Sequence, residues 1–203
     1  MYQDAKFVTP FDAAKTKVVN KCFTLAKSDG QIRFVADLRN CNMFITAPKF
    51  ALPSIYSVLL EPATWMMKFD LSNAFMHFDI HDELKPYCCF KDDKGKMMTW
   101  NKLPWGSSIS PFVCQTIMEP VLHLVRQKYK VQAHIFYDDM VILSVDKERT
   151  RLAGRYLVEL LNKLDMDINY EKSDKEPTTK IEWLGVDVET DLTNPSNISI
   201  SNT

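Results

Sequence analysis

The sequence predicts an α+β fold in which antiparallel β-hairpins are backed by helices. Three observations indicate this class. Two apolar runs meet at the acidic pair Asp138 and Asp139, which reads as strand, turn and strand. Within residues 22–39, Ser-Asp-Gly separates two alternating apolar runs and predicts a second hairpin. Within residues 147–164, apolar side chains recur every four positions, as in a helix with one buried face.

Composition places the chain among ordinary globular proteins. It has 203 residues, of which 46% are hydrophobic and 25% charged, enough for one large or two small domains. No apolar run reaches the ~20 residues of a membrane span, and the N-terminus lacks the apolar core of a secretory signal. The five cysteines form no C-x-x-C pair, which argues against zinc and favours reduced, intracellular thiols.

The elements before the acidic hairpin follow from local signals. A short helix is predicted from Phe11 to about Asn20, and another at residues 55–60, which Pro62 ends. An apolar strand then leads to Asp70. Residues 87–100 form a hairpin whose charged turn holds two further acids, Asp92 and Asp93, which we interpret as structural.

Two helices and a second hairpin complete the pattern. A helix is predicted from Ser110 to about Lys128, kinked at Pro120. Its core face is expected to carry four apolar residues: Val113, Ile117, Val121 and Leu124. The core face of the helix at residues 147–164 is expected to carry Leu152, Tyr156, Leu160 and Leu164.

Carboxylates end two of the apolar strands, at Asp70 and at Asp138 and Asp139. An Asp pair alone is also consistent with a polar turn, because Asp is common in turns. Buried charge is costly unless it is paired or coordinates a metal. Three such acids together predict a site for a divalent cation, because Mg²⁺ is bound by a few carboxylates plus substrate phosphates.

These stretches resemble a known family. The segment DLSNAF at residues 70–75, LPWGSSISP at 103–111 and FYDD at 136–139 resemble, in order, motifs A, B and C of the reverse transcriptase palm. Residues 27–42 are similar to the fingers hairpin of retroviral and LTR-retrotransposon enzymes, Lys-x-Asp-Gly-x-x-Arg followed by Asp-x-Arg-x-x-Asn. The resemblance covers about residues 22–188. Gypsy-like and DIRS-like retrotransposons look most similar.

The resemblance implies a polymerase palm, an antiparallel sheet backed by helices, with a small fingers subdomain and the thumb absent. The N-terminal segment and part of the fingers would occupy residues 1–64. The palm would occupy residues 65–188, with a fingers insertion at about 85–102, and residues 189–203 would form a polar tail or linker.

The resemblance also implies roles for individual residues. Asp70, Asp138 and Asp139 would be catalytic and would bind two Mg²⁺ ions, with Mn²⁺ as an alternative. Lys172 matches the motif D lysine that protonates the leaving pyrophosphate, although an exposed loop lysine fits the sequence equally well. Positions implied to bind the incoming nucleotide are Lys27, Arg33, Asn73, Ala74, Phe75, Trp105 and Gly106. Positions implied to contact the primer are Tyr137, Trp183, Leu184 and Gly185.

Residue chemistry supports some of these roles. Phosphates require cationic donors such as Lys27 and Arg33, which would otherwise be solvated cations on an exposed hairpin. Phe75 matches the aromatic steric gate that excludes a ribose 2′-hydroxyl, which disfavours an RNA polymerase. Two residues depart from the family pattern: Tyr137 is bulkier than usual, and Trp105 stands where retroviral enzymes carry Gln.

The function implied is that of an RNA-directed DNA polymerase, a nucleotidyltransferase of retroelement origin. Its partners would be an RNA or DNA template with primer, dNTPs and further domains of a polyprotein, with no membrane partner. It would act inside the cell, in the cytoplasm or a particle, with the nucleus as an alternative. The net charge of −1 indicates weak nucleic-acid binding by this fragment alone. The alternative is a palm-derived scaffold that binds nucleic acid or protein without catalysis, which the missing thumb and Tyr137 favour and the three acids disfavour.

Overall fold

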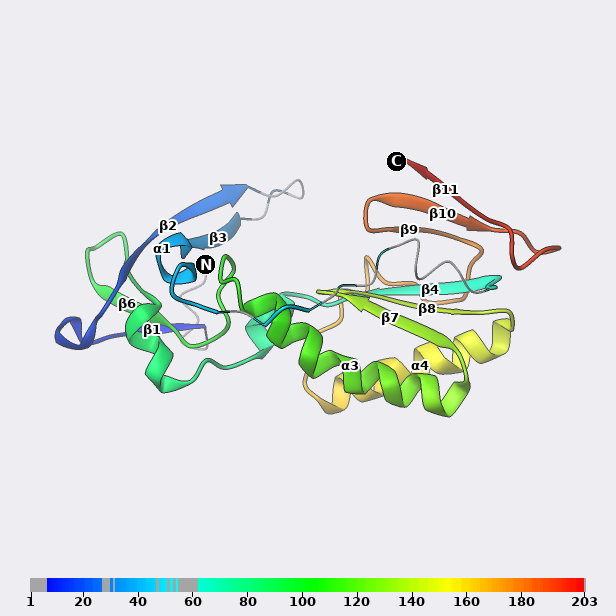
Figure 1. Ribbon diagram of the computed structural model, residues 1–203, viewed down its shortest axis with the longest axis horizontal. Helices are drawn as coiled ribbons and strands as arrows, with labels where there is room; N and C mark the ends of the chain where they lie inside the picture. Colours follow the sequence, from blue (N-terminus) through cyan, green and yellow to red (C-terminus); the bar gives the residue numbers. More distant parts are fainter. Residues whose placement is uncertain are drawn as a thin grey trace. The chain divides into compact units, whose positions relative to one another are not determined.

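The computed structural model divides into two compact units (Figure 1). Unit 1 comprises Met1–Lys49 and Phe75–Val113, and unit 2 comprises Phe50–Ala74 and Cys114–Thr203. The structure describes residues 7–26, 30, 32–46, 48–50, 52, 54 and 62–202, with the backbone alone at positions 32, 33 and 202. The helix predicted at residues 55–60 lies outside the described residues.

Unit 1 is built on a five-stranded sheet in the order β1-β6-β5-β2-β3. Neighbouring strands are antiparallel except β2 and β5, which are parallel. The strands are β1 (Val8–Pro10), β2 (Val19–Ala26), β3 (Ile32–Asp37), β5 (Cys89–Lys91) and β6 (Met97–Trp100). The short helices are η1 (Ala13–Lys15), α1 (Arg39–Asn42) and η3 (Asp82–Tyr87), and η2 (Ala74–His77) follows strand β4 in the chain.

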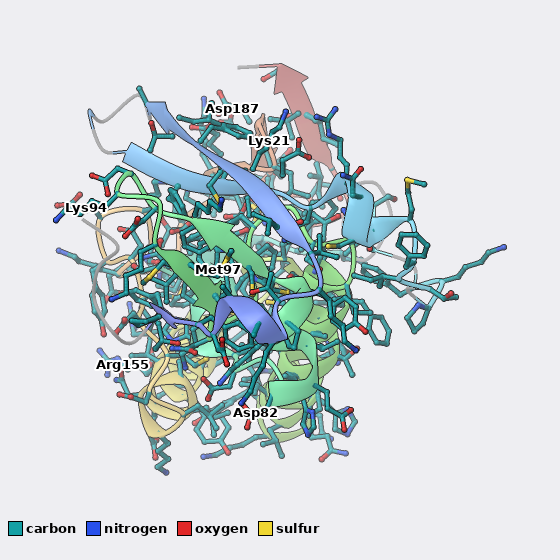
Figure 2. All side chains as sticks on the ribbon, turned by 90° about the vertical axis from the view of Figure 1, so that its left-hand side faces the viewer. Lys21, Asp82, Lys94, Met97, Arg155 and Asp187 are labelled. Atoms are coloured by element: carbon teal, nitrogen blue, oxygen red, sulfur yellow. The ribbon has the colours of Figure 1, made fainter. Side chains whose placement is uncertain are left out.

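Both hairpins predicted for this unit are present. Strands β2 and β3 pair from Lys21 with Asp37 to Ala26 with Ile32, and β5 pairs with β6. At the β5–β6 turn, Lys94 is exposed and projects outward (Figure 2). The predicted helix from Phe11 to Asn20 is only the three residues of η1, because β2 begins at Val19.

Three aromatic rings form the centre of unit 1. Trp100 is fully buried, and its ring lies 5.5 Å from Phe34 and 5.9 Å from Phe90, measured between centroids. Aromatic side chains bury large apolar areas, so this cluster stabilises the packing of β3, β5 and β6 within the unit.

Unit 2 contains two antiparallel three-stranded sheets, in the orders β4-β8-β7 and β11-β10-β9. In Figure 1 the helices α3 and α4 lie on one side of β4, β8 and β7, and the second sheet lies on the other. The elements are β4 (Trp65–Asp70), α3 (Ser110–Tyr129), β7 (Gln132–Phe136), β8 (Asp139–Ser144), α4 (Lys147–Lys163), β9 (Lys180–Trp183), β10 (Val186–Thr190) and β11 (Ile198–Asn202). The first turn of α3, up to Val113, belongs to unit 1. None of the described helices is long and apolar enough to cross a membrane.

The predicted core faces of the two long helices are only partly right: Val121 of α3 is buried as predicted, but several of the other positions are not. In α3, Ile117 and Leu124 are 44% and 46% exposed, and the buried side chains include Cys114, Met118 and Leu122. In α4, Leu152 and Leu164 are likewise exposed. The buried residues of α4 are Thr150, Ala153, Gly154, Leu157 and Leu161.

Small residues explain the error in α4. A Cβ added at Gly154 would lie 2.8 Å from the Met67 sulfur and 3.1 Å from the Phe69 ring, so the helix packs closely on β4. Close packing at this point requires small side chains, so the buried face combines Ala153 and Gly154 with Leu157 and Leu161. The predicted face of α4 followed the large apolar residues and therefore missed the small residues on the buried face.

The structure also differs from the expected polar tail at the C-terminus. Ile198–Asn202 forms β11, which pairs with β10 from Thr190 opposite Ile198 to Val186 opposite Asn202. Ile198 and Ile200 alternate with serines, and Ile198 packs against the core of unit 2. Polar composition hid this period-2 pattern, which is typical of a strand with one covered face.

Candidate active site

Strand pairing brings Asp70 directly opposite Asp139, at the ends of β4 and β8. Side chains of directly opposed residues point to the same face of the sheet, with Cβ atoms about 4.5–5.5 Å apart. The predicted acidic hairpin is confirmed, because Phe136 of β7 pairs with Asp139 of β8. This pairing leaves Tyr137 and Asp138 as a two-residue turn.

The turn has a strained backbone that its neighbours fix. Tyr137 has a φ of 60°, a left-handed conformation that bulky L residues rarely adopt. The thiol of Cys114 donates to the Tyr137 carbonyl at 3.3 Å, and the amide of Leu71 donates to the Asp138 carbonyl at 3.1 Å. Strain of this kind persists where surrounding contacts over-determine it, and it is concentrated at functional sites.

The three acids at this end of the sheet influence one another electrostatically. Burial raises the pKa of Asp139 to about 6, and the negative charges of Asp138 and Asp70 contribute to the increase. The positive charges of Lys68 and Lys172 lower the same pKa. Like charges at short range disfavour ionisation, so this end of the sheet is suited to a cation.

The segment after α4 places Lys172 beside the acids. Its backbone follows the end of β4, where the amide of Asn169 donates to the Asp70 carbonyl at 2.9 Å. The amide of Asp70 in turn donates to the Ser173 hydroxyl at 3.0 Å. Lys172 lies between these two contacts, and its side chain is exposed. Its role as a proton donor remains a prediction.

Lys68 and Ser173 are site residues that the sequence analysis missed. Residues two apart on a strand point to the same face, so Lys68 could have been assigned to the face of Asp70. No comparable signal marks Ser173, because its contact with Asp70 depends on how the segment after α4 folds back onto β4.

The hairpin assigned to primer contact has a tight turn. Trp183 pairs with Val186, and the turn residues Leu184 and Gly185 have φ values of 52° and 78°. Two positive φ values are typical of a type I′ turn, which favours glycine. The Trp183 side chain is only 2% exposed and packs in the core of unit 2, so the turn residues and the backbone remain for primer contact.

The loop with Trp105 and Gly106 lies in unit 1. Gly106 has a φ of 99°, and a Cβ there would lie 2.6 Å from the Ala36 carbonyl oxygen. The side-chain amide of Asn42 donates to the Gly106 carbonyl at 2.8 Å, and its oxygen accepts from the Ser108 amide at 2.9 Å. The loop conformation therefore requires glycine, and Asn42 fixes it from both sides.

The other predicted nucleotide-binding residues are distributed between the units. Phe75, like Trp105, is partly buried against the core of unit 1. In unit 2, Asn73 is exposed with a φ of 53°, and Ala74 is buried. Lys27 and the Arg33 side chain lie outside the described residues. The nucleotide contacts of all seven positions remain predictions.

Asp139→Asn is expected to stabilise the metal-free chain at pH 8 but to leave its stability at pH 4 almost unchanged. The pKa rises from about 3.9 in unfolded Asp to about 6 in the folded chain, so the folded state binds the additional proton between these values. The free energy of unfolding therefore falls by roughly 1–3 kcal/mol as the pH rises through this window. Asn cannot ionise, so the variant does not lose this stability. Urea unfolding at both pH values, with chelator present, measures the effect; equal stabilities at pH 8 would contradict it.

The arrangement of sheets and helices is that of a polymerase fingers and palm. Solved structures of foamy virus protease-reverse transcriptase show the same fold. One, in complex with double-stranded DNA, matches with a TM-score of 0.78 at 19% identity, over 97% of this chain and 32% of that chain. A second, of the native prototype foamy virus protein, has a TM-score of 0.74 at 21% identity, over 88% of this chain and 23% of that one.

Sequence comparison identifies the family. The sequence model of the family "Reverse transcriptase (RNA-dependent DNA polymerase)" matches residues 25–188. The Gag-Pro-Pol polyprotein of Human T-cell leukemia virus 2 is 26% identical over 176 residues, which cover 82% of this chain and 12% of the polyprotein. The Gag-Pol polyprotein of Rous sarcoma virus subgroup C is 25% identical over 172 residues, 80% of this chain and 10% of the polyprotein. The chain belongs to the reverse transcriptase family, and it spans about a tenth of these relatives.

Proposed function

We propose that this chain is the fingers and palm core of an RNA-directed DNA polymerase. It adds dNTPs to a primer 3′-hydroxyl, directed by an RNA or DNA template. The observation that supports this most strongly is the pairing of Asp70 with Asp139, next to Asp138 in a fixed turn, in a chain of this family. Because the relatives are polyproteins, we also propose that it works with further domains, in the cytoplasm or in a particle.

The proposed cofactor is a pair of Mg²⁺ ions, with Mn²⁺ as an alternative. In the described part of the chain, no group of three or more His, Cys, Asp or Glu side chains is arranged to hold a metal ion alone. One or two carboxylates plus substrate phosphates suffice for Mg²⁺, so the acids present fit. Asp70 and Asp138 would hold the ions, with Asp139 supporting them. When bound, such ions activate the attacking hydroxyl and neutralise the leaving pyrophosphate.

The chain's own residues would orient the reactants and move one proton. Lys172 is exposed beside the acids and would donate a proton to the leaving pyrophosphate as a general acid. The Leu184–Gly185 turn would contact the primer, together with Tyr137. Lys27 and Arg33 would bind the triphosphate of the incoming nucleotide, because cationic donors match phosphate oxygens. The remaining nucleotide contacts would come from Asn73, Ala74, Phe75, Trp105 and Gly106.

Phe75→Val is expected to increase ribonucleotide incorporation relative to dNTP incorporation, if the ring excludes the 2′-hydroxyl. Val keeps apolar contact with the core of unit 1, where Phe75 is partly buried, while it opens space. The measurement is the ratio of kcat/KM for a ribonucleotide and its matching dNTP. Phe78→Val, which changes another partly buried ring of the same core, is the control. An active Phe75→Val enzyme with an unchanged ratio would remove Phe75 from this role.

Primer extension tests the proposal directly. A labelled DNA primer on an RNA template is incubated with the chain, dNTPs and Mg²⁺ or Mn²⁺, and extension is expected only when a divalent ion is present. A parallel assay with ribonucleotides tests for RNA synthesis. Binding of the primer-template without extension under every condition would instead support the non-catalytic scaffold.

A further inference from the structure

Lys68 is a cation on the strand that ends at Asp70, and the reaction proposed above assigns it no role. It lies two residues before Asp70 in β4, on the same face of the sheet. Its partner across the sheet is Val141 of β8. Its positive charge also lowers the pKa of Asp139.

The Lys68 side chain links the two sheets of unit 2. Its ammonium group donates to the Glu182 carbonyl at 2.8 Å, one residue before Trp183 at the end of β9. A backbone bridge between Met66 and Thr178 also joins β4 to the segment that leads into β9, but it lies further from the Leu184–Gly185 turn. The Lys68 hydrogen bond therefore acts at the turn end of the β9–β10 hairpin.

The Lys68 backbone is also held, by two hydrogen bonds to Asp174. Its amide donates to the Asp174 carboxylate at 2.8 Å, and its carbonyl accepts from the Asp174 amide at 2.9 Å. With both ends fixed, the length of the side chain sets the separation between β4 and the Glu182 carbonyl.

Apolar contacts alone would not set this separation. Ile181 and Trp183 of β9 pack with Met66 and Val141 of the other sheet. Such contacts are non-directional and depend on buried area. A charge-assisted hydrogen bond is directional and stronger than a neutral one, so it can fix the hairpin in one position.

We propose that Lys68 is a positioning residue that holds the Leu184–Gly185 turn at a fixed distance from Asp70 and Asp139, and thereby places the primer 3′ end. The effect on the primer rests on the proposed polymerase function. The effect on the turn does not, so the two can be tested separately.

Hydrogen exchange tests the link without catalysis. In Lys68→Met, amides of residues 184–187 are expected to exchange about tenfold faster, because one charge-assisted hydrogen bond is lost. Lys68→Arg keeps a cationic donor and should restore most of the protection. Lys163→Met removes an equal charge from the exposed Lys163–Glu159 pair on α4 and should leave this segment unchanged. Unchanged exchange in Lys68→Met, or equal acceleration in Lys163→Met, overturns the proposal. If Lys68→Met does not fold, Lys68→Gln replaces it.

Primer extension then tests the consequence for the reaction. Lys68→Met is expected to lower kcat about tenfold while it changes KM for the dNTP less than twofold, because the primer terminus is misplaced and the nucleotide is not. Lys68→Arg should recover kcat. An unchanged kcat in a Lys68→Met chain with a loosened turn would overturn the role in primer placement. A wild-type chain that extends no primer would instead refute the proposed function, while hydrogen exchange still decides whether Lys68 holds the turn.

Discussion

Asp70→Asn is expected to reduce primer extension by roughly a thousandfold or more, because it removes a charge that the proposed metal ions require. Asn has nearly the same size as Asp, and the backbone contacts of Asp70 with Asn169 and Ser173 do not involve its carboxylate. The fold should therefore be retained. The same substitution should lower the pKa of Asp139, since the Asp70 charge contributes to raising it.

The measurement is single-turnover extension with Mg²⁺, together with a carboxyl NMR titration of Asp139. Asp93→Asn is the matched control, because Asp93 is an exposed acid in the β5–β6 turn. The control should extend primers at the wild-type rate. If Asp70→Asn retained more than about a tenth of wild-type extension, the metal-dependent mechanism proposed for this site would be wrong.

Gly106→Ala is expected to destabilise unit 1 by about 3 kcal/mol or more, through two effects that add. A left-handed backbone conformation costs a non-glycine residue on the order of 1–3 kcal/mol. In addition, the new Cβ would approach the Ala36 carbonyl oxygen at 2.6 Å, and a backbone atom of β3 cannot move aside cheaply. The loop that Asn42 fixes would have to shift away from β3.

Gly95→Ala separates the two effects. Gly95 has a φ of 78°, but a Cβ there would meet no atom within 4 Å. It should therefore cost only the conformational part, on the order of 1–3 kcal/mol. Urea denaturation of both variants gives the difference in free energy of unfolding. Equal losses would mean that the approach to Ala36 carries no cost.

The sequence was informative where local pattern and chain order determine structure. Turn residues located the hairpins, and the acids at the ends of apolar strands predicted the meeting of Asp70 with Asp139. Packing between residues far apart in the chain could not be predicted in this way. The buried face of α4 depends on close contact between Gly154 and Met67, and no local pattern reports such a contact. The link from Lys68 to Glu182 joins two sheets whose arrangement only the fold determines.

The family resemblance assigned roles by position in a motif, without information on burial. Trp183 was expected at the primer, but the structure places its side chain in a core. A large aromatic residue next to a glycine turn fits either location, and burial decides between them. In the opposite direction, Ser199 and Ser201 made residues 198–202 look like a tail, although pairing with β10 makes them a strand.

The burial of two tryptophans allows the units to be monitored separately by intrinsic fluorescence. Trp100 belongs to unit 1 and Trp183 to unit 2, and in the described part of the chain neither indole N–H has a hydrogen-bond partner. The chain has four tryptophans, so replacing Trp65, Trp105 and one of these two with Phe leaves a single emitter. Each of the two indole rings would become exposed to water only when its own unit unfolds. Coincident denaturation curves for the two reporters would show one cooperative step, and separate curves would show that each unit melts by itself.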